Sequence, residues 1–140
     1  MCGIAGIFNA DRTRSVDGTA CAAMAATLRH RGPDDTGRFT APGVALGFTR
    51  LSIIDLGGGN QPHSNEDESV VSVCNGEIYN HKALRAELAG HGHRFRSQCD
   101  VEVLVHLYEQ DGTALANRLN GQFAFAVYDS TRHRLILGRD

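Results

Sequence analysis

Short apolar runs that contain β-forming residues recur along the chain and predict strands. They cover residues 3–8, 44–55, 69–74, 122–128 and 134–138. Most of these runs are bounded by glycine, proline, asparagine or aspartate, the residues that favour turns. The last two runs are joined by a short polar turn, so we expect them to pair with each other.

Apolar residues at helical spacing lie between these runs. We predict a helix over residues 16–30, which are rich in alanine. A second helix opens at Asn80, a third is capped by Asp100 and ends at Gly112, and a short one surrounds Leu115. Because the strands come in neighbouring runs and do not alternate strictly with long helices, we predict an α+β fold of antiparallel sheets covered by helices.

The composition fits one globular domain and argues against several classes of partner. The chain has 140 residues, of which 41% are hydrophobic and 21% charged, which is enough for a real core. A net charge of -2 without a lysine or arginine cluster argues against nucleic acid. No apolar segment approaches the roughly 20 residues of a membrane span, and no signal peptide is evident, so we expect a cytoplasmic protein. The 4 cysteines form no Cys-x-x-Cys pair and are expected to be free thiols.

Cys2 is a candidate catalytic residue because it directly follows the initiator methionine. If Met1 is removed, Cys2 carries both a thiol nucleophile and a free α-amine that can act as its general base. An α-amine with a pKa of about 7.7–8.0 can take the proton of a thiol whose pKa is about 8.5. For a cysteine at this position alone, the alternative is a small buried apolar residue.

Five segments, in order along the chain, resemble one family. They are residues 1–8 (MCGIAGIF), 29–34 (RHRGPD), 49–55 (TRLSIID), 75–80 (NGEIYN) and 100–103 (DVEV). Together they resemble the glutaminase domain of glutamine-hydrolysing asparagine synthetase. The resemblance implies a class II glutamine amidotransferase of the N-terminal nucleophile hydrolase superfamily, whose members fold as a four-layer α/β/β/α sandwich.

The resemblance also implies how this chain relates to a longer protein. From the resemblance we expect residues 1–140 to form one glutaminase domain that is incomplete at its C-terminus, with the synthetase domain absent. ATP and Mg²⁺ are expected only in that synthetase domain, so this chain is expected to hold no cofactor. The implied partners are L-glutamine and the synthetase domain, and a homo-oligomer is left open. Ammonia released from glutamine would serve ATP-dependent synthesis of asparagine from aspartate.

Free glutamine is distinguished by its α-carboxylate and α-ammonium groups, so its site needs a cation and a carboxylate. Arg50 matches the family position for the α-carboxylate, which a guanidinium binds in a bidentate manner. Asp100 and Glu77 match the positions around the α-ammonium, although an aspartate before an apolar run is also an ordinary helix N-cap. Strand alternation would place Arg50 and Ser52 on one face. Backbone groups of the following residues are expected to line the pocket as well: Leu51, Ser52, Ile53 and Ile54.

Asn75 and Gly76 match the positions that would stabilise the oxyanion formed when Cys2 attacks the amide. The asparagine amide and a glycine N–H can converge on one oxygen where a strand breaks. The alternative is an ordinary Asn-Gly hairpin turn. The following residues lead into a helix and not into a returning strand, which argues against that alternative.

No metal site is predicted. His91 and His93 flank a glycine without a nearby third ligand and are expected to face solvent. His106 is expected to be a partly buried helix residue, and Cys74 and Cys99 to serve packing. The loop at residues 29–34 is expected to lie near the active site.

The sequence differs from the family pattern at three positions. Thr49 stands where histidine is frequent, while Cys99 and Val101 flank Asp100 where serine and threonine are usual. These differences bear on the polarity of the pocket and not on the class of reaction. An amidotransferase for another acceptor, or an inactive interaction domain, stays open as an alternative function.

Overall fold

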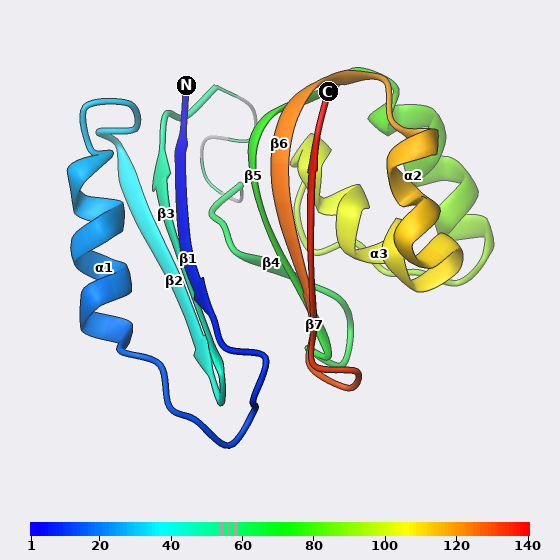
Figure 1. Cartoon of the computed structure of the whole chain (residues 1–140). Coiled ribbons are helices and arrows are strands. Elements are labelled where there is room, and N and C mark those ends of the chain that lie inside the picture. The colour runs from blue at the N-terminus through cyan, green and yellow to red at the C-terminus, as the bar shows by residue number, and fades with distance from the viewer. Residues whose placement is uncertain (54, 56, 58) are drawn as a thin grey trace.

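Two antiparallel sheets lie face to face with helices on both outer sides, as Figure 1 shows. The structure is a computed structural model and describes every residue except 54, 56 and 58. The first sheet has the order β1-β3-β2 and the second the order β4-β5-β6-β7. The strands of the first sheet are β1 (Gly3–Phe8), β2 (Asp35–Ala41) and β3 (Val44–Arg50), and those of the second are β4 (His63–Ser64), β5 (Val70–Ile78), β6 (Gly121–Asp129) and β7 (Arg134–Arg139).

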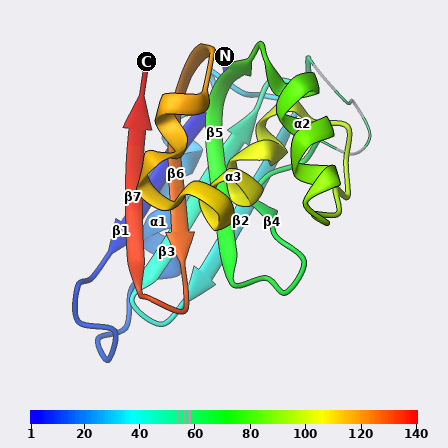
Figure 2. The same ribbon diagram turned by 90° about the vertical axis from the view of Figure 1, so that its right-hand side faces the viewer.

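One helix covers the first sheet and the remaining helices cover the second. Helix α1 (Gly18–Thr27) packs on β1 and β3, whereas α2 (His81–Gly90) and α3 (Val103–Asp111) lie over the second sheet, as Figure 2 shows from that side. Two short 3₁₀ segments, η1 (Asp100–Glu102) and η2 (Gly112–Arg118), flank α3. The predicted α+β class and the four-layer α/β/β/α sandwich are both confirmed.

Strand β6 shows how the two inner interfaces arise from side-chain alternation. Ala126 and Tyr128 belong to the buried cluster between the two sheets, together with residues of β3. Phe125 and Val127 point to the opposite face and join the larger cluster under α2 and α3. Successive side chains of a strand face opposite sides, so one apolar strand can serve two cores.

Helix α1 approaches the first sheet closely because small residues face each other there. Cys21 and Ala25 are the buried residues of this helix. A Cβ atom added at Gly47 of β3 would lie 2.8 Å from the Ala25 Cβ, so glycine permits the contact.

Within the described residues, no helix is long and apolar enough to cross a membrane.

Several predicted boundaries differ from the structure. Strand β3 ends at Arg50, so the predicted strand over 44–55 is wrong for the described residues 51–53 and 55. Strand β5 does not break at Asn75 and Gly76 but continues to Ile78, because β6 runs beside it as far as Gly121 and supplies hydrogen-bonding partners. Strand β2 was not predicted.

Candidate active site

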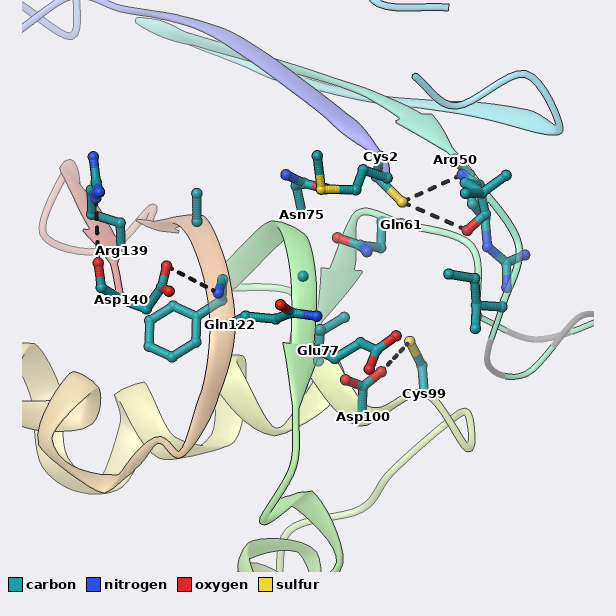
Figure 3. A pocket seen from close by; sticks show the side chains of 18 residues that line it. Cys2, Arg50, Gln61, Asn75, Glu77, Cys99, Asp100, Gln122, Arg139 and Asp140 are labelled. Carbon is teal, nitrogen blue, oxygen red and sulfur yellow. Dashed lines mark hydrogen bonds between the residues drawn. The ribbon is translucent and has the colours of Figure 1, made fainter. Parts of the chain in front are cut away.

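A cavity of about 340 Å³ lies where both sheets contribute residues, at the end of the sandwich that holds both chain termini (Figure 1). That volume is within the range of small-molecule sites. Eight of the predicted site residues line it: Cys2, Arg50, Leu51, Ile53, Asn75, Gly76, Glu77 and Asp100. Figure 3 shows that they come from different elements, with Cys2 before β1, Arg50 at the end of β3 and Asp100 at the start of η1.

The thiol of Cys2 is held against the segment that follows β3. Its Sγ atom lies 3.4 Å from the backbone N of Leu51 and 3.7 Å from the Leu51 carbonyl oxygen. The Cys2 carbonyl accepts a hydrogen bond from Arg31 Nε at 3.1 Å. Pairing of Gly3 with Thr49 fixes the start of β1 beside the end of β3. The nucleophile candidate is therefore positioned by backbone groups and by one guanidinium.

The loop at residues 29–34 supports the same region, as predicted. Gly32 lies directly on β3, where an added Cβ would be 2.5 Å from the Thr49 carbonyl oxygen. The Asp34 carboxylate accepts from the backbone N–H of Ser52 at 2.7 Å, and the Asp34 N–H donates to the Arg50 carbonyl at 3.0 Å. These bonds hold the 50–52 segment in place beside Cys2.

Arg50 is 5% exposed and supplies positive charge to the cavity wall. Its guanidinium donates to Asn60 Oδ1 at 2.6 Å and to the Asp55 carbonyl at 2.6 Å. Because β3 ends at Arg50, the predicted alternation of Arg50 and Ser52 along one strand face does not apply. Ser52 is not among the described lining residues, and Ile54 lies outside the described residues.

Two carboxylates contribute negative charge to the same cavity. Asp100 is buried, and its Oδ2 accepts the backbone N–H of Ile78 at 2.7 Å. Its carboxylate therefore ties η1 to the end of β5 and does not cap a helix, so the N-cap prediction is wrong in its chemistry. Glu77, on β5, lines the cavity beside it. A cation and two carboxylates on one cavity suit a ligand that carries both charges.

Asn75 and Gly76 lie within β5, opposite Ala124 and Phe123 of β6. Gly76 has φ +148°, a backbone conformation that residues other than glycine rarely adopt. An added Cβ would also collide with the Gln122 backbone. Glycine is thus required by the strand itself, and the hairpin alternative for this dipeptide is wrong.

Gln61 is a buried residue of the site that the sequence did not reveal. Its side-chain amide donates to the Cys74 carbonyl at 3.0 Å and accepts from the Cys74 N–H at 2.6 Å. Both bonds attach the segment after Arg50 to the residue that precedes Asn75. Gln61 lies in a run of glycine, asparagine and proline, and from the sequence this run predicted only a loop and no role for Gln61.

The other thiols near the cavity differ from Cys2 in burial. Burial raises the pKa of Cys99 to about 12 and raises that of Cys74 as well, because a thiolate is costly to hold away from water. Both cysteines belong to the core cluster, as the packing role predicted. At neutral pH neither supplies a thiolate nucleophile.

Two histidines differ from their predicted surroundings, whereas His91 is exposed as predicted. The side chain of His93 is only 11% exposed and His106 is fully buried, so the predictions of a solvent-facing His93 and a partly buried His106 are wrong. Burial lowers the pKa of His106, with opposing contributions from Glu66 and Glu109. None of these residues belongs to the cavity that contains Cys2.

The fold and the site together define a glutamine amidotransferase domain. The profile of the family described as glutamine amidotransferase domain matches residues 1–140, so the chain belongs to this family. The chain is 44% identical over 142 residues to asparagine synthetase (glutamine-hydrolyzing) 2 of Bacillus subtilis strain 168. It is 41% identical over 141 residues to asparagine synthetase B (glutamine-hydrolyzing) of Escherichia coli strain K12. Both alignments cover 100% of this chain but only 19% and 25% of the relatives.

A solved structure agrees with this assignment at the level of the fold. Glutamine phosphoribosylpyrophosphate amidotransferase from B. subtilis, complexed with ADP and GMP, matches with a TM-score of 0.75 and 18% sequence identity. The match covers 100% of this chain and 37% of that protein. The two-sheet sandwich is therefore shared between proteins whose sequences have diverged widely.

Proposed function

We propose that this domain hydrolyses L-glutamine to glutamate and ammonia with Cys2 as the nucleophile. The observation that carries the proposal is one cavity lined by a partly exposed thiol, a guanidinium and two carboxylates. Arg50 would bind the α-carboxylate, while Glu77 and Asp100 would surround the α-ammonium. Backbone groups of Leu51 and Ile53, which line the cavity, would complete the pocket.

The reaction would proceed in two steps. The Cys2 thiolate attacks the side-chain amide carbon, and the negative charge moves to the amide oxygen, where Asn75 and Gly76 would donate hydrogen bonds. The α-ammonium of Cys2 returns its proton to the leaving nitrogen, so ammonia departs and a thioester remains. Water then attacks the thioester, which releases glutamate and regenerates the free thiol of Cys2. Both steps require removal of Met1.

The acceptor of the ammonia is proposed from the relatives. The chain spans about a fifth to a quarter of the asparagine synthetases that it matches. We propose that in a longer protein this domain supplies ammonia to a synthetase region that makes asparagine from aspartate, with ATP and Mg²⁺ bound there. A cytoplasmic location is part of the same proposal.

Release of glutamate from glutamine tests the proposal, with mass spectrometry to confirm that Met1 is absent. Cys2→Ala should lower the rate by at least roughly 10³-fold, as loss of a covalent nucleophile does in other hydrolases. Cys21→Ala is the matched control, because Cys21 is buried on α1 and does not line the cavity. Equal rates for Cys2→Ala and the unaltered protein would overturn the proposal.

A further inference from the structure

Two histidines and two glutamates gather on the far side of the second sheet, away from the proposed active site. His93 follows α2, His106 lies within α3, Glu109 is one turn further along α3, and Glu66 follows β4. One nitrogen or oxygen from each residue lies within 4.8 Å of the others. His106 and Glu109 are three residues apart on one helix, so they share a face.

The distances within this cluster suit ligands of one ion better than hydrogen-bonded ion pairs. His93 Nδ1 lies 3.6 Å from Glu66 Oε1 and 3.4 Å from Glu109 Oε2. His106 Nδ1 lies 3.6 Å from Glu66 Oε2 and 3.4 Å from Glu109 Oε2. A charge-assisted hydrogen bond between such groups would be about 2.7–2.9 Å long. Ligands about 2.0–2.2 Å from a tetrahedral ion lie roughly 3.3–3.6 Å apart. The two distances to Glu109 Oε2 fall in this range. The two distances to Glu66 also fall in it, but they end on different oxygens of its carboxylate.

His106 supplies an independent reason to expect a ligand. Its side chain is 0% exposed, and within the part of the chain that the structure describes neither ring nitrogen has a hydrogen-bond partner. A buried polar atom without a partner costs free energy, so native proteins rarely leave one. A metal ion bound to Nδ1 would satisfy that one of the two ring nitrogens. The Phe95 ring packs edge-on against the imidazole and fixes its orientation.

The other three residues are held by groups outside the cluster. Asn65 Nδ2 donates to Glu109 Oε1 at 3.0 Å, which leaves Oε2 facing the histidines. The Arg94 N–H donates to Glu66 Oε1 at 2.6 Å. The side-chain amide of Gln110 lies 2.9 Å from His93 Nε2, and a half-turn of that amide would offer its oxygen to an Nε2–H. Such outer contacts are typical of metal ligands.

We propose that Glu66, His93, His106 and Glu109 bind one divalent transition-metal ion, for which Zn²⁺ is the best match. Two carboxylates and two neutral imidazoles carry a charge of minus two, which a divalent cation neutralises. Four protein ligands fill a tetrahedral Zn²⁺ site, so the ion would be structural and not catalytic. It would join the loop after α2 to α3 and to the turn after β4.

Metal binding by the purified protein tests this site without reliance on enzyme activity. After treatment with a chelator, equilibrium dialysis against Zn²⁺ should return one ion per chain, with a rise in melting temperature. His93→Gln and Glu109→Gln should each weaken binding by at least about 10-fold. His91→Gln and Glu68→Gln are the matched controls, because both residues are exposed and lie outside the cluster, and they should bind normally.

Co²⁺ provides a second readout that does not depend on how the variants fold. The unaltered protein should give the intense visible bands of a tetrahedral ion without the sulfur-to-cobalt charge-transfer band of a thiolate ligand. A thiolate band would place the ion on a cysteine and overturn the assignment. Absence of Zn²⁺ binding, or binding unchanged in both His93→Gln and Glu109→Gln, would also overturn it and would indicate an ion-pair cluster.

Discussion

At the scale of single residues, charges of both signs on the wall of one cavity support the proposal that it binds glutamine. Arg50 and Asp100 are both almost fully buried, and each is held by hydrogen bonds to backbone groups. Buried charged groups are expensive unless they are paired or hydrogen-bonded. Both groups also line one cavity, which suits a ligand that carries an anionic and a cationic group.

Arg50→Lys keeps the charge but removes the planar fork that can bind a carboxylate through two parallel bonds. We expect the KM for glutamine to rise roughly 10-fold or more, since one charge-assisted hydrogen bond is lost, with a smaller change in kcat. Steady-state glutaminase kinetics measure both constants. An unchanged KM would show that Arg50 does not bind the α-carboxylate of glutamine.

Asn75→Ala should have the opposite kinetic effect. The amide of Asn75 would donate chiefly to the oxyanion that forms during attack, so its loss should lower kcat by roughly 10²-fold or more, with little change in KM. A variant that changed KM alone would show that Asn75 is a structural residue of β5.

Some residues of the candidate site could be predicted from the sequence, and others could not. Cys2, Arg50 and Asp100 could be predicted because each belongs to a motif whose neighbouring residues match the family pattern. Gln61 was hidden because its role is to bond the backbone of Cys74, which is distant in sequence. Glu66 and His106 are 40 residues apart, so only the folded chain brings them together.

At the scale of elements, the approach of the 29–34 loop to β3 depends on Gly32. Gly32→Ala would place a Cβ 2.5 Å from the Thr49 carbonyl, and the loop would have to move away from β3. We expect a loss of stability of about 1–3 kcal/mol, typical of overpacking, together with lower glutaminase activity, because the same loop bonds Cys2 and Ser52.

Gly90→Ala is the control for that substitution, since an added Cβ at Gly90 meets no atom of the described residues within 4 Å. Chemical denaturation should leave it as stable as the unaltered protein or slightly more stable. If both variants behaved alike, the close contact between Gly32 and β3 would not matter.

The elements missed by the sequence share a physical cause. Strand β2 contains Asp35 and Gly37, which are weak strand formers, and it forms because β3 offers a full set of partners. The Asn75-Gly76 pair reads as a turn, but β6 pairs with β5 on through Ile78. In both cases pairing with a neighbouring strand overrides local preference. Strand β3 follows β2 directly in the chain, whereas β6 lies far from β5 in the sequence.

At the scale of the whole molecule, β7 forms one edge of the second sheet among the described strands. Leu137 on this strand is 73% exposed, and an apolar edge strand favours association with another chain. We expect the 140-residue chain to self-associate with increasing concentration in size-exclusion chromatography. Leu137→Lys should reduce this association, because a charged edge discourages strand pairing.

Met24→Lys is the matched control for the edge, because Met24 is also apolar and exposed but lies on α1. It should leave the association unchanged. If the chain stays monomeric at every concentration, β7 does not mediate association between chains.

Covalent labelling of Cys2 tests the proposed nucleophile most directly. A diazo-ketone analogue of glutamine is added at neutral pH to protein whose loss of Met1 has been confirmed, and the adduct is located by mass spectrometry. We predict one label, on Cys2, because burial raises the pKa values of Cys74 and Cys99 and keeps these thiols protonated. A label on Cys74 or Cys99, or no label at all, would contradict the assignment.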